Sequence, residues 1–385
     1  MKVIYVTTSL EESDYNNFNK MWDVSLNPSN QNFHNKIIRS LAIYNHVDVI
    51  SIRPFSKEKC HINELQQITR EVDNVTYHYL KINRDKFGRI HLIKKQSKKI
   101  VSDIKDKETV IITDTINPKC LLLTNYLQRT FRIPAIGICT DSPSNITGTT
   151  RSYTMYLLKR AQRLNGFVTL TEGLNFLFNK QNKPHIVLEG VVESNRTDPK
   201  IKKVDGKYIF FGGALLPRYG VYNLIEAFKS IENKDVSLLI CGHHADIEAI
   251  NKAISEDSRI KFLGTLPVSE VLVLEKDAIA NINPRPFTQD LDRLSIPSKT
   301  LEYLASGTLT ISVRNTELEK GFKDCAIWAK TGDSKDLAQA MLTAINMNDD
   351  ERKKIAEIAK NTAISKYSLE KVGELITDFS STLLK

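Results

Sequence analysis

The stretch IPSKTLEYLASG, residues 296–307, combines charged side chains with the pattern of a short helix. Gly307 is a typical residue to end a helix, and Pro297 lies just ahead of the first turn, where a missing N–H costs little. Ser298 is the expected N-cap residue. The apolar positions follow at helical spacing: Leu301, Leu304 and Ala305. The stretch therefore predicts a helix with a single buried stripe.

Lys299 and Glu302 lie one turn apart near the start of this helix. A serine cap followed by a glutamate is common and needs no ligand. A cation in the first turn is different, because the helix dipole already makes that end positive. Lys299 therefore predicts an anionic group close to the N-terminus of the helix.

A second candidate site is the sequence FFGGALLPRYG, in which Gly212 and Gly213 follow a predicted strand. The next helix is expected to begin near Val221 or Tyr222. A strand, a glycine turn and a helix can bring backbone N–H groups to a phosphate, and Arg218 would add a forked cation. A plain tight turn is the alternative interpretation.

Arg218 and Lys299 follow different strands of one predicted parallel sheet. Because ligands of open α/β sheets bind beyond the carboxyl ends of the strands, both cations could face the same ligand. A diphosphate would satisfy them, and Glu302 could accept hydrogen bonds from the vicinal hydroxyls of a ribose. Together these residues predict a nucleotide diphosphate linked to a sugar.

The elements that must position these residues form two series of strands that alternate with amphipathic helices, a pattern typical of parallel α/β sheets. The first series comprises KVIYVT, VDVISI, VTYHYL, TVIITD, IPAIGIC and GFVTL, and the second comprises YIFFGG, VSLLICG, IKFLG, AIANINP, LTISV and AIWAK. The polar, charged stretch 193–207 is typical of a linker. The sequence thus predicts an N-terminal domain over residues 1–192, a C-terminal domain over 193–367, and a final helix over 368–385 that packs on the N-terminal domain.

Polar residues near other strand ends are further candidates. Asp141 could orient or deprotonate an acceptor hydroxyl, although an Asx turn or a cap within DSPSN is the favoured alternative. Glu172 could simply belong to a helix cap within TEGLN. His243 and His244 could line a cleft, but adjacent histidines on a strand point to different faces and do not form a metal pair. Because no glycine precedes Gly88, a glycine-rich dinucleotide loop at the N-terminus is disfavoured.

The formal net charge of +9 is concentrated in one region. Between Lys81 and Lys107, ten Lys or Arg stand against three Asp, which suits an anionic surface such as lipid headgroups. A solvated helix face is an equally good interpretation. The region has few interleaved aromatic residues, which argues against a nucleic-acid partner.

The cysteines and the hydropathy pattern favour a cytoplasmic protein. The five cysteines are scattered and contain no CxxC pair, which argues for reduced thiols and against a zinc site. The start MKVIYVTTSLEESDY lacks the long apolar region of a signal peptide, and no run approaches the ~20 apolar residues of a membrane span. The chain could therefore touch a membrane but is not expected to cross it.

From about Val110 onward, the sequence resembles the family 4 glycosyltransferases of the GT-B fold, in a bacterial polysaccharide-type branch. The main motifs are GGALLPRYGVYNLIEAF, LLICGHHADIEAI, RIKFLGTLPVSEVL and NINPRPFTQDLDRLSIPSKTLEYLASG, supported by TDSPSN and VTLTEGLNFLFNKQNKPHIVLEG. PSKTLEYLASG is the most specific of them. The resemblance implies an α/β protein with two Rossmann-like domains facing across a cleft, with the last helix crossing back to the first domain.

The resemblance also implies an activity: a retaining transferase that moves a hexosyl group from a nucleotide-diphosphate sugar, UDP-sugar first, to a hydroxyl of a lipid-linked, polysaccharide or glycoprotein acceptor. Glu302 matches the helix glutamate of the family's two-glutamate motif, which implies a contact to the ribose. The expected catalytic residues are Asp141, Arg218 and Lys299. The expected donor-binding residues are Gly212, Gly213, Arg218, Gly242, Gly264, Thr265, Pro297, Ser298, Lys299 and Glu302. The implied location is the cytoplasm, at the inner face of the membrane; the oligomeric state, the donor sugar and the acceptor stay open.

The sequence departs from the family at several positions. Leu294 stands eight residues before Glu302, where many members carry their first glutamate. Ala214 and Tyr219 occupy the common arginine and lysine positions of the glycine loop, and Leu309 replaces a usual proline. These departures leave a second function open, namely a non-catalytic subunit of the same fold that supports a partner transferase.

The triplet Asp290-Leu291-Asp292 matches the DxD motif that holds a metal in a different glycosyltransferase fold. We expect it to lie in a loop, with Arg293 offsetting part of its charge. Two cations and two helix N-termini already supply positive potential for a diphosphate. The sequence therefore predicts that neither a metal ion nor another cofactor is needed.

Overall fold

The computed structural model describes residues 1–22, 28–53, 64–83, 86–146, 148–193, 205–243 and 246–384. The chain divides into two compact units, which are Met1–Val191 with Leu369–Lys385 (unit 1) and Val192–Ser368 (unit 2). Most of the predicted linker, as well as Cys60 and His244, lies outside the described residues. Among the described residues, no helix is long and apolar enough to cross a membrane.

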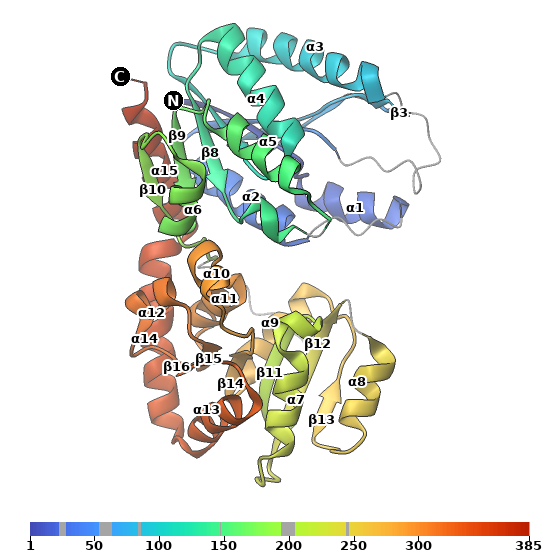
Figure 1. The fold of residues 1–385 in the computed structure, drawn as a ribbon, viewed down its shortest axis with the longest axis vertical. Helices are drawn as coiled ribbons and strands as arrows, with labels where there is room; N and C mark the ends of the chain where they lie inside the picture. Colours follow the sequence, from blue (N-terminus) through green and yellow to red (C-terminus); the bar gives the residue numbers. More distant parts are fainter. Residues whose placement is uncertain are drawn as a thin grey trace. The chain divides into compact units, whose positions relative to one another are not determined.

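Unit 1 is built on one mixed sheet with the strand order β10-β9-β8-β7-β1-β2-β5-β4, of which β8, β9 and β10 are labelled in Figure 1. The strands are β1 (Lys2–Thr7), β2 (His46–Ser51), β4 (Ile68–Val72), β5 (Val75–Tyr79), β7 (Thr109–Asp114), β8 (Ala135–Cys139), β9 (Gly166–Thr169) and β10 (His185–Val187). All neighbours are parallel except β4, which runs antiparallel to β5. A small antiparallel pair, β3 (Glu64–Leu65) and β6 (Ile82–Asn83), lies apart from this sheet. The strands predicted for this half are present, and the structure adds β3, β4, β6 and β10.

The helices of unit 1 pack on its sheet and on one another. They are α1 (Glu12–Trp22), α2 (Pro28–Ala42), α3 (Lys86–Ile104), α4 (Pro118–Phe131), α5 (Arg151–Ala161), α6 (Glu172–Phe178) and α15 (Leu369–Thr382), with the short η1 (Pro143–Asn145). The final helix, α15, packs closely on α2, since a Cβ at Gly373 would lie 2.0 Å from the carbonyl oxygen of Ser40. A glycine is therefore required where these two helices meet.

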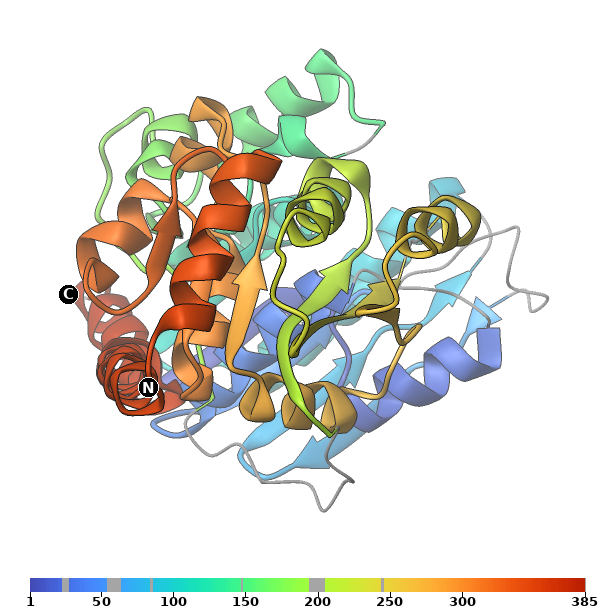
Figure 2. The same cartoon turned by 90° about the horizontal axis from the view of Figure 1, so that it is seen from below.

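Unit 2 is built on a fully parallel sheet with the order β13-β12-β11-β14-β15-β16. Its strands are β11 (Lys207–Ala214), β12 (Val236–His243), β13 (Ile260–Phe262), β14 (Ala280–Asn283), β15 (Thr310–Val313) and β16 (Ile327–Ala329). Its helices are η2 (Pro217–Tyr219), α7 (Val221–Lys229), α8 (Ile247–Ile254), α9 (Val268–Asp277), α10 (Gln289–Leu294), α11 (Ser298–Ser306), α12 (Thr316–Phe322), α13 (Ser334–Asn346) and α14 (Asp349–Tyr367). In Figure 2, α7 (yellow-green) and α13 (orange-red) lie near each other beside this sheet, and the two helices are in contact.

Alternate residues of β11 explain why helices cover both faces of this sheet. Ile209 and Phe211 join the larger core cluster, to which α7 and α13 contribute, whereas Tyr208 and Phe210 join a smaller cluster with α9. A parallel strand buried on both faces reads as a continuous apolar run, which is why YIFFGG was recognisable as a strand.

The order of strands in unit 2 reverses between β11 and β14. From β11, the chain first moves outward to β12 and β13 and then returns to β14 on the other side. Such a reversal leaves a crevice at the carboxyl ends of the two adjacent strands, where ligands of this architecture bind. The two segments predicted to carry site residues lie after these strands in the chain: FFGGALLPRYG ends β11 and continues beyond it, and IPSKTLEYLASG comes after β14.

Candidate functional site

The glycines at the end of β11 and β12 bring two backbones unusually close. Gly213 and Gly242 are partners in the strand register. Gly242 has a φ of +151°, and a Cβ there would lie 1.7 Å from the carbonyl oxygen of Gly213. Glycine is required at position 242 for both reasons.

Gly264 and Thr265, which follow β13, make hydrogen bonds to Gly242. The Gly242 N–H donates to the carbonyl oxygen of Gly264 at 2.9 Å, and the Thr265 hydroxyl donates to the Gly242 carbonyl at 3.0 Å. The structure therefore gathers several predicted site residues at the carboxyl ends of β11, β12 and β13. We call this group the glycine edge; it consists of Gly212, Gly213, Gly242, Gly264 and Thr265.

Helix α11 begins at Ser298 and ends at Gly307, which has a φ of +82°. Its buried residues include Leu301, Leu304 and Ala305, as predicted. The prediction of Ser298 as N-cap is wrong, because Pro297 holds the extended cap position and Ser298 is already helical. The proline supplies no side-chain acceptor, so α11 starts without a side-chain cap. The Thr300 N–H donates instead to the carbonyl oxygen of Pro297 at 2.9 Å.

Tyr303 connects α11 to the glycine edge. Its buried hydroxyl accepts a hydrogen bond from the Gly212 N–H at 3.0 Å and donates to the Gly212 carbonyl at 3.2 Å. One side chain therefore satisfies both backbone groups of this residue and fixes the distance between α11 and β11. Tyr303 was not predicted as a site residue, because its contact with Gly212 depends on the strand order.

Lys299 finds its anionic partners inside the protein. Its ammonium lies 3.1 Å from Glu302 Oε2 and 3.7 Å from Glu275 Oε1. Burial lowers the pKa of Lys299, but the Glu302 and Glu275 carboxylates outweigh this effect and hold that pKa well above its usual value. The anions that the structure places beside Lys299 are thus two carboxylates of the same unit, and the contact to a diphosphate that the sequence predicted stays a prediction.

Sequence reasoning missed Glu275. It lies on α9, and its side chain is only 1% exposed. A glutamate next to Val273 and Leu274 in a largely apolar helix is the signal that could have found it, since buried carboxylates are almost always paired.

Arg218 lies in η2, between the glycine edge and α7. Its guanidinium carbon lies 5.0 Å from the centre of the Tyr219 ring, and that of Arg285 lies 5.9 Å from the same ring. The two loops meet tightly, because a Cβ at Gly220 would lie 2.1 Å from the Pro284 carbonyl oxygen. The reversal between β11 and β14 thus brings two arginines to the same aromatic ring.

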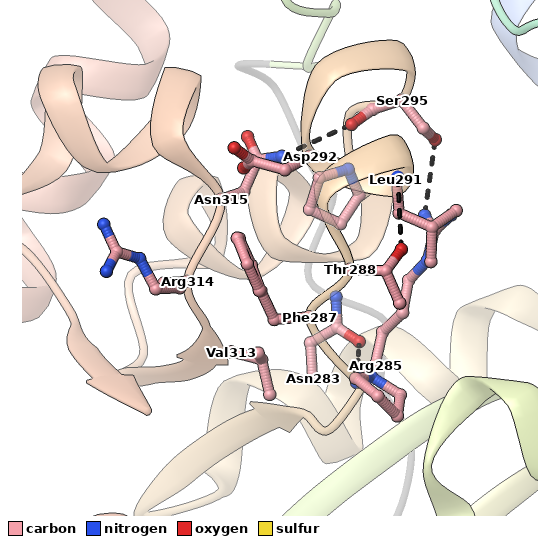
Figure 3. Close-up of a pocket in the computed structure, with 12 residues that line it drawn as sticks. Asn283, Arg285, Phe287, Thr288, Leu291, Asp292, Ser295, Val313, Arg314 and Asn315 are labelled. Carbon is pink, nitrogen blue, oxygen red and sulfur yellow. Dashed lines mark hydrogen bonds between the residues drawn. The ribbon is translucent and has the colours of Figure 1, made fainter. Parts of the chain in front are cut away.

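Arg285 also reaches a pocket beside the carboxyl ends of β14 and β15 (Figure 3). The pocket has a volume of about 300 Å³, including space open to solvent. Its lining residues are Asn283, Arg285, Pro286, Phe287, Thr288, Leu291, Asp292, Ser295, Pro297, Val313, Arg314 and Asn315. Figure 3 shows Arg285 extending toward Ser295, to whose Oγ its Nη1 donates at 3.4 Å. Arg285 was missed as a candidate, although its position directly after a predicted strand was a usable signal.

The DxD triplet lies in helix α10, so the prediction of a loop is wrong. The Thr288 hydroxyl caps this short helix by accepting the Leu291 N–H at 3.2 Å. Asp292 accepts hydrogen bonds from the N–H and the hydroxyl of Thr316, both at 2.6 Å. It therefore ties α10 to the start of α12. In the parts of the chain that the structure describes, no group of three or more His, Cys, Asp or Glu side chains is arranged to hold a metal ion.

The remaining predicted candidates are Asp141, Glu172 and His243. In unit 1, Asp141 Oδ1 accepts hydrogen bonds from the Ser142 N–H at 2.7 Å and from the Asn145 side chain at 2.8 Å. Both contacts are local, but they are not those of an Asx turn, because the residue two positions on is Pro143, which has no N–H, and Ser142 is the residue that caps η1. Near Glu172, the hydroxyl of Thr171 caps α6. His243 is exposed at the end of β12.

Comparison with known proteins adds a sequence match within unit 2. Residues 193–362 match the family described as glycosyl transferases group 1. No curated protein matches the sequence.

Solved structures match the whole chain at low sequence identity. A sucrose-phosphate synthase from Thermosynechococcus elongatus has 12% identity and a TM-score of 0.70, covering 100% of this chain and 99% of its own. A glycosyltransferase from Rickettsia africae has 14% identity and a TM-score of 0.71, and the match covers 100% of this chain and 98% of the glycosyltransferase. HepE from Anabaena, solved in complex with UDP, has 13% identity and a TM-score of 0.69, and the match covers 99% of this chain and 100% of HepE. The fold is therefore that of GT-B glycosyltransferases, with two Rossmann-like domains.

Proposed function

We propose that this protein is a retaining glycosyltransferase of the family 4 type, in a bacterial polysaccharide branch. It would transfer a hexosyl group from a nucleotide-diphosphate sugar to a hydroxyl of a lipid-linked, polysaccharide or glycoprotein acceptor. The observation that carries the proposal is the joining of α11 to the glycine edge of β11 through Tyr303, within the segment that matches group 1 glycosyl transferases. UDP is the first nucleotide to test, because HepE was solved with UDP.

The proposed chemistry rests on positioning and charge. When the sugar–phosphate bond breaks, negative charge develops on the leaving diphosphate, and groups preorganised around it lower the barrier. Arg218, Arg285 and the first N–H groups of α11 would supply this stabilisation. Lys299 would add its charge beside Glu302, and Asp141 would orient the acceptor hydroxyl or take its proton.

Glu302 gives the first test of this proposal. We expect Glu302→Ala to weaken binding of UDP by roughly 1–3 kcal/mol, because the ribose hydroxyls would lose their hydrogen-bond acceptor. Calorimetry measures the change directly. Glu256→Ala is the matched control, since Glu256 also pairs with a lysine, Lys229 at 2.8 Å, but is exposed near the end of α8. Unchanged affinity in Glu302→Ala would remove the ribose assignment.

Donor turnover is expected to need no divalent metal. In the proposed site, Arg218, Arg285 and the start of α11, where Pro297 provides no side-chain cap, would offset the diphosphate charge in place of a metal. We expect full activity in excess EDTA and a modest loss in the double variant Asp290→Asn/Asp292→Asn. Activity that disappears on chelation and returns with magnesium or manganese would show that this prediction is wrong.

We also propose that unit 1 binds anionic membranes from the cytoplasmic side through α3. Ile93 and Ile100 are buried, whereas Lys95, Lys98 and Lys99 are exposed on the same helix. Each cation near an anionic bilayer contributes about 1 kcal/mol of binding.

Changing these three lysines to glutamine should therefore reduce sedimentation with phosphatidylserine vesicles. The same change at three exposed lysines of unit 2, Lys234, Lys353 and Lys354, is the charge-matched control. Sedimentation of the unaltered protein that ignores both salt and lipid charge would count against membrane binding.

A non-catalytic binding subunit is the second candidate function. Leu294, the last residue of α10, stands where the sequence resemblance places the first glutamate of the motif. A leucine cannot hold sugar hydroxyls through hydrogen bonds. This candidate predicts that the nucleotide binds and that no sugar is transferred.

A further inference from the structure

Glu275 is a buried carboxylate for which the proposed reaction has so far no use. Its side chain is 1% exposed, and that of Lys299 is 35% exposed. A buried carboxylate costs several kcal/mol unless a cation and hydrogen bonds compensate for it. The ammonium of Lys299, 3.7 Å away, supplies the opposite charge.

The backbone of Glu275 is held in place by the neighbouring strand. The Asn281 side chain on β14 donates to the Glu275 carbonyl at 2.9 Å and to the Ser306 hydroxyl of α11 at 3.3 Å. The Thr308 hydroxyl donates to the carbonyl of Lys276, the next residue of α9, at 3.1 Å. The end of α9 is therefore fixed relative to α11, so that Glu275 is a rigid anchor for Lys299.

Lys299 transmits this anchoring to Glu302. Its ammonium lies closer to Glu302, at 3.1 Å, than to Glu275, and 5.9 Å from the centre of the Tyr303 ring. Glu302 is the more exposed of the two carboxylates, at 23%. The ammonium thus joins a buried carboxylate to one that can reach a ligand.

We infer that Glu275 is a positioning residue for nucleotide recognition, which acts through Lys299 to hold the Glu302 carboxylate where it accepts the ribose hydroxyls. The inference rests on the proposed function, since it assigns Glu302 to the ribose. Without Glu275, Lys299 is free to turn toward solvent, and Glu302 loses a fixed partner. The ribose contact weakens as a result, while contacts to the base and the diphosphate persist.

The test compares two nucleotides, UDP and 2′,3′-dideoxyuridine diphosphate, by calorimetry. We expect Glu275→Gln to weaken UDP binding by roughly five- to tenfold, the scale of one charge-assisted hydrogen bond. The dideoxy nucleotide has no ribose hydroxyls to lose, so we expect its affinity to change less than about twofold. Glu256→Gln is the control and should leave both affinities unchanged.

A second variant covers the case in which Glu275→Gln does not fold. The double variant Glu275→Gln/Lys299→Met removes the buried charge pair as a whole, which proteins often tolerate. Because Lys299 is also proposed to add its charge near the diphosphate, both nucleotides should bind this variant more weakly, and UDP should lose more affinity than the dideoxy nucleotide. Equal losses for both nucleotides, or no loss for UDP, in the variant that folds would overturn the inference.

Two other results concern the proposed function itself. If Glu302→Ala binds UDP as tightly as the unaltered protein, or if the unaltered protein binds no UDP, the ribose assignment fails and the inference about Glu275 fails with it. A loss in Glu302→Ala with none in Glu275→Gln keeps the proposed function and rejects only the inference.

Discussion

Replacing Arg218 and Arg285 together by alanine is expected to lower kcat/KM for the nucleotide-sugar donor by roughly a thousandfold, the scale of removing preorganised charge from a leaving group. Both guanidinium groups approach the ring of Tyr219, one from η2 and one from the segment after β14. Tyr219 occupies a position where the sequence resemblance expects a lysine. Arg285, which follows the neighbouring strand β14, would therefore supply the cation that is missing at position 219.

Steady-state kinetics of the two single variants and the double variant measure this effect. Because both cations would act on one developing charge, we expect the effects to be non-additive. Lys320→Ala is the control, since Lys320 is an exposed cation of unit 2 that pairs with Glu317 on α12. A double variant that keeps more than about a tenth of the activity would reject the role of the two arginines.

Gly242→Ala is expected to have the largest effect on stability, about 4 kcal/mol or more, because it combines a backbone clash with an unfavourable φ. The added Cβ would lie 1.7 Å from the Gly213 carbonyl oxygen, which is backbone and cannot turn aside. Strands β11 and β12 would have to separate at their carboxyl ends, where the nucleotide is proposed to bind. Thermal denaturation and UDP calorimetry should therefore both show a loss.

Gly264→Ala is the matched control for this substitution. Gly264 also has a positive φ, +71°, but nothing lies within 4 Å of the position that its Cβ would take. We expect a cost of only about 1 kcal/mol, from backbone strain alone. Equal melting temperatures for Gly242→Ala and the unaltered protein would show that the close approach at Gly213 is not present in solution.

Most strands could be predicted from the sequence because each is buried on both faces of a parallel sheet and forms an uninterrupted apolar run. Phe210 and Phe211, which enter opposite core clusters, are the clearest case. Helix α10 was missed because its six residues have no buried face to create a periodic pattern. Strands β4 and β10 lie at the edges of their sheet, where burial is incomplete and the pattern is weak.

The candidate site was predictable where the chemistry is local. Gly307 ends α11 because it has a positive φ, and Lys299 needs an anion because it lies in the first turn. Of the two carboxylates that pair with Lys299, Glu302 lies one turn away on the same helix and was visible in the sequence, whereas Glu275 was not predictable, since it reaches Lys299 from a different helix. Arg285 approaches Tyr219 only because β14 lies beside β11 in the sheet, a neighbour relation that periodicity does not contain.

The most direct measurement is the release of nucleotide from a panel of nucleotide sugars by the purified full-length chain. We expect one donor, with UDP-sugars tested first, to release its nucleotide diphosphate, EDTA to leave this release unchanged, and the Arg218→Ala/Arg285→Ala variant to slow it by roughly a thousandfold. Calorimetry on the same panel reports binding independently of turnover. A chain that binds a nucleotide sugar and never releases the diphosphate would support the non-catalytic subunit instead, and a chain that neither binds nor cleaves any donor would contradict the central claim.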